Sequence, residues 1–240
     1  MKRRRILFTA FFVFCLSNVK GQEMNMFFKK ANTFFSTYVK DGKVAYKTVS
    51  ENPLLLEELV ALTKNAKIEK EPKEEYQAFW INAYNILVID QVVKNYPLKS
   101  PLDVNGFFDS KIYEVGALSF TLNDIENKIL RKKFPDEARF HFVLVCAGLG
   151  CPPIIDEAYV PQKLEMQLQR QTEIALNNPE FIRVSGNKVK VSQIFQWYKN
   201  DFIKKKQGLV DFINRYRQTQ LPENAKISYY SYDWRLNEEK

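Results

Sequence analysis

The chain has 240 residues, 45% of them hydrophobic, and a formal net charge of +8. Residues 1–21 hold five of its 36 Lys and Arg residues and none of its acids, so the remaining 219 residues carry a net charge of only +3. This mixed charge argues against nucleic-acid binding. Two cysteines remain beyond residue 21, which is too few to define a disulfide scaffold, so hydrophobic burial must supply most of the stability.

The first 21 residues have the pattern of a secretory signal peptide. A basic start precedes the apolar stretch Ile6–Leu16, which is too short to span a bilayer as a stable helix. Val19 and Gly21 then provide the residues that precede a cleavage site before Gln22. We therefore expect an extracytoplasmic protein (periplasmic, cell-surface or secreted) with no stable membrane span after cleavage. An uncleaved N-terminal anchor is the alternative.

Hydrophobic periodicity and turn residues predict a chain of mixed elements beyond the signal peptide. Helices are predicted over residues 24–39, 53–66, 71–96, 122–133, 156–177 and 193–202, with another ending near 216. Strands are predicted over residues 43–46, 111–115, 117–120, 140–146, 181–184, 188–191 and 226–230. We expect residues 22–240 to form a single α+β domain, mostly helical, with a small central sheet and a long buried helix near 72–95.

The helix predicted over residues 71–96 is apolar nearly all round at its centre, which indicates burial. Asn82 and Asn85 would then be amides in the core, one turn apart. A buried amide without a partner costs about 1–3 kcal/mol, so each must be satisfied. They are either clips that hold a neighbouring loop or contributors to a site.

The only histidine and the last two cysteines fall within residues 139–153. If residues 140–146 form a strand, His141 and Cys146 lie roughly 16 Å apart and on opposite faces, so a direct pair is not expected. Cys151 would have to retrace the strand to reach His141. Cys146 and Cys151 are separated by four residues that include two glycines, so a tight turn can join them as a disulfide.

Glu126 lies at the edge of the buried face of its predicted helix, where it can orient His141 or Arg139. The alternative is a boundary glutamate paired with a nearby base. Asp201 and Asp233, which lie among aromatic residues, have the same ambiguity. We predict no metal site, because the cysteines and the histidine lack zinc-ligand spacing, and no cofactor.

Five motifs give the chain a resemblance to the family catalogued as domain of unknown function 547. They are FWINAYN at 79–85, LNDIE at 122–126, RFHFVLVCAGLGCP at 139–152, WYKNDF at 197–202 and YSYDWRLN at 230–237. The chain departs from the family pattern between the cysteines, where Ala147, Gly148, Leu149 and Gly150 replace a loop that usually carries serine. The resemblance implies residues to test and no reaction.

These residues lead to two hypotheses for an unknown ligand or peptide. In the first, a pocket performs thiol-dependent acyl or peptide chemistry, with Cys146 or Cys151 as nucleophile and Glu126 with His141 as the assisting pair. The expected pocket also includes Asn82, Asn85, Tyr84, Arg139 and Asp233. In the second, the chain is a non-catalytic binding module with a structural Cys146–Cys151 disulfide. The sequence leaves open whether the protein is an enzyme, and it indicates no oligomeric state.

Overall fold

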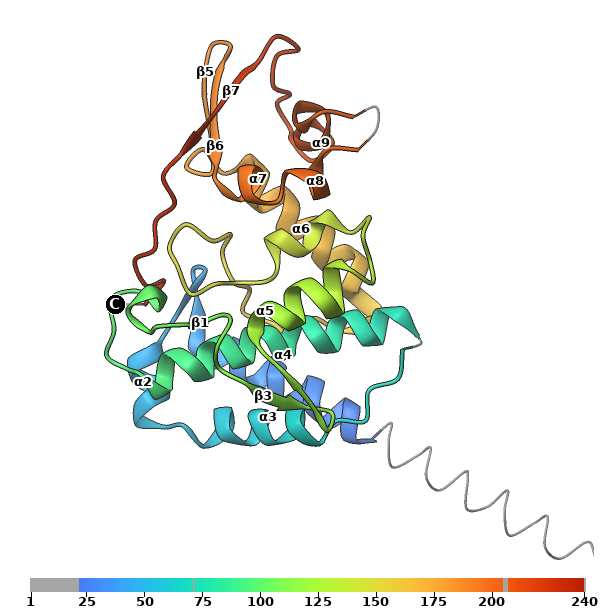
Figure 1. The fold of residues 1–240 in the computed structure, drawn as a ribbon, viewed down its shortest axis with the longest axis vertical. Coiled ribbons are helices and arrows are strands. Elements are labelled where there is room, and N and C mark those ends of the chain that lie inside the picture. The colour runs from blue at the N-terminus through green and yellow to red at the C-terminus, as the bar shows by residue number, and fades with distance from the viewer. Residues whose placement is uncertain (1–21, 71, 205–206, 240) are drawn as a thin grey trace, which may run out of the picture.

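The long helix α4 (Lys73–Lys94) runs through the centre of the first part of the fold (Figure 1). It is described from a computed structural model that covers residues 22–70, 72–204 and 207–239. Glutamates in the first turn and Lys94 in the last turn match the helix dipole. Every residue from Tyr76 to Val92 is buried, which confirms the burial expected from the sequence. The expected signal peptide lies outside the described residues.

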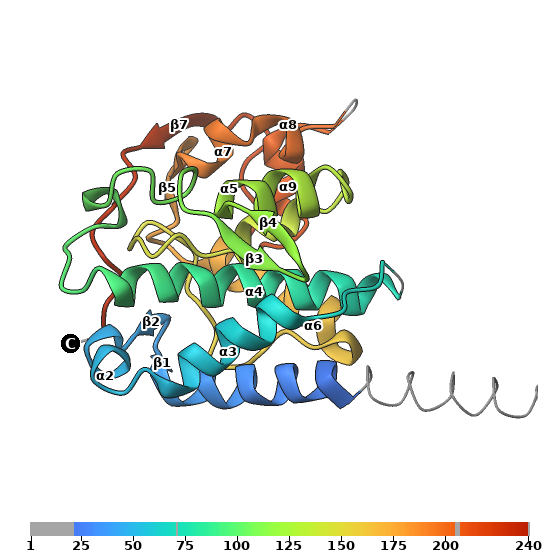
Figure 2. The same cartoon turned by 60° about the horizontal axis from the view of Figure 1, so that its bottom comes forward.

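Several N-terminal elements and one hairpin pack around α4 and form the first hydrophobic cluster (Figure 2). They are a helix over residues 22–38, the hairpin β1 (Val39–Lys40) and β2 (Lys43–Val44), α2 (Tyr46–Glu51), α3 (Leu54–Asn65), and the antiparallel pair β3 (Tyr113–Val115) and β4 (Leu118–Phe120). Phe27 of the first helix meets Phe79 of α4 with ring centroids 4.9 Å apart. Burying an aromatic side chain of this size contributes about 1.5–3 kcal/mol.

A short irregular region connects α4 to the second half of the chain. It contains the 3-10 turn η1 (Pro101–Asp103), α5 (Leu122–Asp124) and the π-helix η2 (Ile125–Arg131). Thr121 accepts a hydrogen bond from the Asp124 amide, and Asp124 accepts one from the Thr121 amide, so the two residues form a capping box at the start of the helix predicted from residue 122.

The second part of the fold has its own hydrophobic cluster, built around Phe142, Phe195, Phe202 and Phe212. Its elements are η3 (Ala138–Phe142), β5 (Ile182–Ser185), β6 (Lys188–Ser192), α7 (Ile194–Trp197), α8 (Lys199–Phe202), α9 (Leu209–Asn214) and β7 (Lys226–Tyr230). The turn η4 (Pro161–Lys163) lies against α4, and α6 (Leu164–Asn177) begins in the first cluster and ends in the second. Strand β6 pairs antiparallel with β5 and parallel with β7. This small sheet lies at the top of Figure 1, away from α4.

The C-terminal tail, residues 231–239, joins the two parts. In Figure 1 it runs from β7 back to the region of α2 and β1. Its backbone bonds the loop between the cysteines, where the Leu149 amide donates to the Arg235 carbonyl at 2.7 Å. It also bonds β2, where the Val44 amide donates to the Asn237 carbonyl at 3.0 Å. The tail therefore fixes the cysteine loop from outside.

The predicted α+β class is confirmed, with small sheets among many helices. Two element predictions are wrong. Residues 140–146 are not a strand, because the chain forms the 3-10 turn η3 and then continues irregularly. Phe140 packs into the first cluster and Phe142 into the second, so the segment bridges the two. The helix predicted from residue 156 begins at Leu164, after a turn that contains Pro161.

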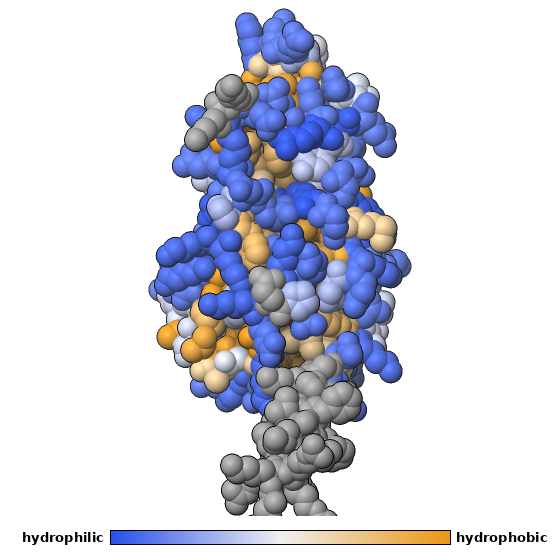
Figure 3. Space-filling view, turned by 90° about the vertical axis from the view of Figure 1, so that its right-hand side faces the viewer, coloured by the Kyte–Doolittle hydropathy of each residue, from blue (hydrophilic) through white to orange (hydrophobic). Residues whose placement is uncertain are grey.

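Hydrophilic residues predominate on the face shown in Figure 3. Within the described ranges, no helix is both long enough and apolar enough to cross a bilayer.

Candidate functional site

A pocket of about 230 Å³ lies where residues of the two hydrophobic clusters meet. Its wall is mainly aromatic, with side chains contributed by Tyr84, Phe108, Trp197, Tyr198, Tyr232 and Trp234. Glu126, His141 and both cysteines also line it. An apolar cavity with a few convergent polar groups is the usual form of a small-molecule site.

Cys146 and Cys151 lie at disulfide distance in the pocket wall, with their Cα atoms 6.3 Å apart. The Tyr232 hydroxyl lies 3.0 Å from each sulfur. The Cys146 amide also donates to the Cys151 Sγ at 2.9 Å. Burial raises the pKa of Tyr232 well above its usual range, so this hydroxyl keeps its proton and can donate to a sulfur.

The glycines between the cysteines let the tail approach closely. A Cβ atom on Gly150 would lie 2.9 Å from the Asp233 amide nitrogen and 3.0 Å from the Tyr232 ring. At Gly148 it would lie 3.2 Å from the Asp233 carbonyl oxygen. Because side chains at these positions would push the tail away, the glycines help to hold Tyr232 against the sulfurs.

His141 is buried and bonded to an ionised carboxylate. Its Nε2 lies 2.7 Å from Asp201 Oδ2, and Arg131 Nε donates to the same oxygen at 2.7 Å. Burial opposes the charge on Asp201, but the bonds from His141 and Arg131 outweigh it and hold the pKa of Asp201 well below its usual range. Nε2 therefore donates its hydrogen to Asp201, which leaves Nδ1 as the acceptor of the neutral ring.

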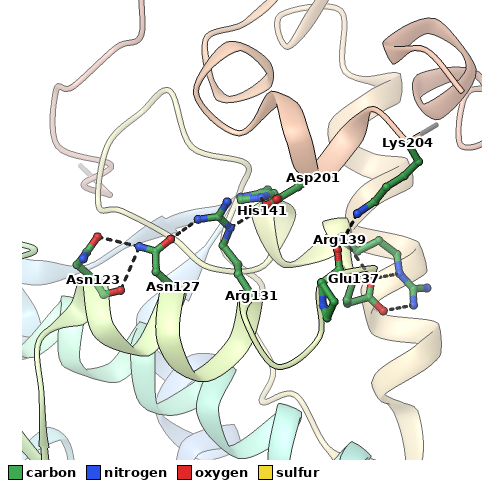
Figure 4. A network of polar contacts seen from close by, with 9 residues as sticks. Asn123, Asn127, Arg131, Glu137, Arg139, His141, Asp201 and Lys204 are labelled. Atoms are coloured by element: carbon green, nitrogen blue, oxygen red, sulfur yellow. Dashed lines mark hydrogen bonds and ion pairs between the residues drawn. The ribbon is translucent and has the colours of Figure 1, made fainter.

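The His141 ring is further fixed by its neighbours. It packs against the Tyr198 ring with centroids 4.1 Å apart. The Arg131 guanidinium lies over the same Tyr198 ring, 4.6 Å from its centroid. Arg131 also donates to Asn127, which bonds Asn123 at the pocket rim. Figure 4 shows this chain of polar contacts from Asn123 to His141.

Glu126 is held by a tyrosine, and the expected bond to His141 is replaced by the bond from His141 to Asp201. Tyr198 hydrogen-bonds Glu126, and burial followed by the charge of Glu126 raises the pKa of Tyr198. Glu126 still lines the pocket, on the π-helix η2. A π-helical turn is a frequent feature of functional sites because it shifts one side chain out of the regular pattern.

Asn82 and Asn85 serve as clips behind the pocket. Asn85 donates to the Val143 carbonyl at 2.9 Å and accepts from the Val145 amide at 3.0 Å. Asn82 likewise donates to the Tyr159 carbonyl at 2.7 Å and accepts from the Tyr159 amide at 3.0 Å. Asn85 thus positions the segment that leads directly into Cys146, while Tyr84, from the same turn of α4, reaches the pocket itself.

The structure places Arg139 and Asp233 elsewhere. Arg139 pairs with Glu137 and Glu165, and Figure 4 shows Arg139 and Glu137 apart from His141. Asp233 bonds Arg235 and lines a different groove. Three further residues line the pocket and were not among the expected site residues, although they stand in the motifs that carry the family resemblance: Trp197, Tyr232 and Trp234.

The part of the chain that the structure describes contains no candidate metal site. No three His, Cys, Asp or Glu side chains converge there in a way that could hold an ion.

Fold and pocket together define an α+β protein in which a cysteine pair and a buried histidine bonded to Asp201 line one aromatic pocket. Residues 68–174 match the model of the family described as "Protein of unknown function, DUF547", and the matched segment belongs to that family. The predicted resemblance is thereby confirmed. The segment contains Glu126, His141 and both cysteines, whereas Asp201 and Tyr232 follow it. No curated protein and no solved structure matches the chain.

Proposed function

We propose that the protein is an exported thiol-dependent enzyme that acts on an acyl or peptide carbonyl bound in the aromatic pocket. The observation that carries this proposal is that His141, already bonded to Asp201 at 2.7 Å, lines the same pocket as Cys146 and Cys151. Nucleophile, base and a group that orients the base are the parts that covalent acyl transfer requires. Export is supported by the pattern of residues 1–21.

The chemistry begins after an external thiol reductant has opened the bridge. His141 Nδ1 takes the proton of the cysteine thiol, and the thiolate attacks the substrate carbonyl carbon to form a carbon–sulfur bond. The bond to the leaving group then breaks, and the leaving group receives the proton from His141. Water, deprotonated by the same nitrogen, hydrolyses the thioester and restores the thiol. Asp201 keeps the ring oriented and stabilises its charged form.

The remaining pocket groups are suited to holding a substrate. Six aromatic side chains offer apolar contact area with little conformational freedom to lose. Glu126 is an acceptor for an amine or hydroxyl hydrogen, and its bond to Tyr198 fixes its position. These features favour a compact, partly apolar acyl group that carries a hydrogen-bond donor.

A non-catalytic binding module is the second candidate, and the sulfur pairing favours it. If the bridge is permanent, it serves as a staple that shapes the aromatic pocket for a ligand. Its sulfurs then never act as nucleophiles.

Acetylation by p-nitrophenyl acetate distinguishes these candidates without knowledge of the natural substrate. Freshly reduced protein is expected to gain an acetyl group on one pocket cysteine, located by peptide mass spectrometry. His141→Gln is expected to slow acetylation about 10²–10⁴-fold, the range of general-base contributions. Asp201→Asn should also slow it, whereas Asp233→Asn is the matched control and should not. Equal acetylation rates in wild type and His141→Gln would overturn the proposed mechanism.

A further inference from the structure

The aromatic pocket carries a negative charge on Glu126, which lies half-buried in its wall. The two bases on the same π-helix are engaged elsewhere. Lys128 pairs with Asp124 at 2.7 Å, and the charge of Arg131 is balanced by Asp201, also at 2.7 Å. Among the described residues that line the pocket, none is Lys or Arg. The charge of Glu126 is therefore open to a cation that enters the pocket.

The charge of Glu126 acts across the pocket. Burial, and after it this charge, raises the pKa of Tyr84 on α4 and of Tyr198 between α7 and α8. Tyr198 also hydrogen-bonds the Glu126 carboxylate and so fixes its position. A carboxylate has about four acceptor positions, so this bond leaves others for a ligand. The carboxylate is thus held in place and still able to bind.

Four aromatic rings form a connected wall of the same pocket. Tyr232 packs against Trp197 and Trp234, with ring centroids 5.1 and 4.7 Å apart. Phe108 continues the wall, 6.2 Å from the Trp234 ring. Trp197 is exposed, so a ligand can reach its ring from solvent. The faces of aromatic rings attract cations, tryptophan most strongly, and the same rings offer apolar contact to alkyl groups.

We propose that this pocket selects a ligand with a primary alkylammonium group, with Glu126 as the counter-ion and the rings of Trp197 and Trp234 against the alkyl chain. A primary ammonium has N–H groups that the open positions of Glu126 can accept, and a quaternary ammonium has none. In the proposed acyl-transfer reaction this group is carried by the acyl substrate, and only that assignment rests on the proposed function.

The half-buried position of Glu126 makes the selection effective. A partly buried ion pair is screened by salt much less than an exposed one, and a hydrogen bond between charged groups is about twice as strong as a neutral one. The pocket volume of about 230 Å³ accommodates a short alkyl chain, since a water molecule occupies about 30 Å³. A neutral ligand of the same shape gains the apolar contact alone, and an anion is repelled.

Calorimetric titration of the oxidised protein with butylammonium and with butan-1-ol tests this selection. The two probes have the same chain length and differ in charge. We expect butylammonium to bind at least about tenfold more tightly. Equal affinities would overturn the proposal, and tighter binding of butyltrimethylammonium than of butylammonium would overturn the primary head group. Because the sulfurs are bridged in this experiment, butylammonium binding without any acetylation of the reduced protein would support the pocket assignment and contradict the proposed function.

Three variants locate the selection in the pocket. Glu126→Gln removes the charge at nearly constant size and is expected to weaken butylammonium binding about tenfold, with butan-1-ol binding unchanged as the check of folding. Trp197→Leu keeps an apolar side chain and is expected to weaken butylammonium binding about threefold. Exposed Glu57, on α3, supplies the matched control Glu57→Gln, in which no change is expected. Unchanged butylammonium affinity in Glu126→Gln would contradict the assigned counter-ion.

Discussion

At the scale of single residues, the site depends on two side chains that hold others in place. Asp201 fixes the His141 ring through Nε2, and His141 lines the pocket. Tyr232 places one hydroxyl against two sulfurs. Neither residue lies in the segment 68–174 that matches the family model, so residues beyond this segment complete a site whose histidine and cysteines lie within it.

The charge of Asp201 makes the stability of the fold depend on pH in a defined direction. Its pKa is lower in the folded protein than the value of about 3.9 for an unfolded aspartate, so the unfolded chain binds more protons between the two values. The stabilisation is therefore complete above about pH 5 and is lost as the pH falls toward the folded pKa. Asp201→Asn is expected to lower the free energy of unfolding by about 2 kcal/mol at pH 7, the size of a hydrogen bond to a charged group.

Urea unfolding between pH 7 and pH 3 measures this effect. The difference between wild type and Asp201→Asn should be constant above pH 5 and should shrink toward pH 3. Exposed Asp109 supplies the control variant, Asp109→Asn, in which little change is expected. A wild-type advantage that grows as the pH falls would show that the sign is wrong.

At the scale of elements, the segment 138–153 decides how much of the site the sequence could predict. Its apolar residues Phe140, Phe142 and Val143–Val145 have the composition of a buried strand. Hydrophobic periodicity alone does not distinguish a short strand from another buried segment. The structure uses the same apolar content to connect two clusters, with backbone partners supplied by Asn85. The expected separation of His141 from Cys146 was argued from that strand and loses this basis, and the structure places both residues in the lining of one pocket.

Elements with strong local signals were predicted well. The helix start at Leu122, the burial of α4 and the strand Lys226–Tyr230 all follow from nearby residues. The partner of His141 could not be found in this way, because Asp201 lies 60 positions away and reaches the ring only through the packing of α8. Glu126 and Asp201 are both carboxylates, so the sequence does not indicate which of them bonds His141, and only the fold does.

Gly150→Ala tests the close approach of the tail to the cysteine loop. The added Cβ would lie 2.9 Å from the Asp233 nitrogen, so the tail must shift and carry Tyr232 away from the sulfurs. We expect a loss of about 1–3 kcal/mol in the free energy of unfolding, as for other overpacked sites. Urea unfolding of the oxidised protein provides the measurement.

Gly208→Ala is the matched control for this substitution. Its nearest contact would be the Asp211 carboxylate at 3.6 Å, which is an ordinary distance, so a change within about 1 kcal/mol is expected. Equal losses in both variants would show that the effect comes from replacing glycine in general and that the tail contact has no special role.

At the scale of the whole molecule, the pocket lies where two hydrophobic clusters meet, and the tail ties both to the cysteine loop. Such a junction brings together side chains from distant parts of the chain while each cluster stays packed. Cys151 of the bridge lines both this pocket and a second groove of about 310 Å³. This placement suits a thiol that is stored as a disulfide and released on demand.

Thiol accessibility tests the central claim most directly. Native protein is alkylated before and after a mild dithiol treatment, and peptide mass spectrometry reports the state of Cys146 and Cys151. We expect neither cysteine to be labelled before treatment and both to be labelled after it, with acetylation by p-nitrophenyl acetate appearing only in the treated sample. If both cysteines remain unlabelled in folded protein after treatment, the bridge is a permanent staple and the claim of thiol chemistry is contradicted.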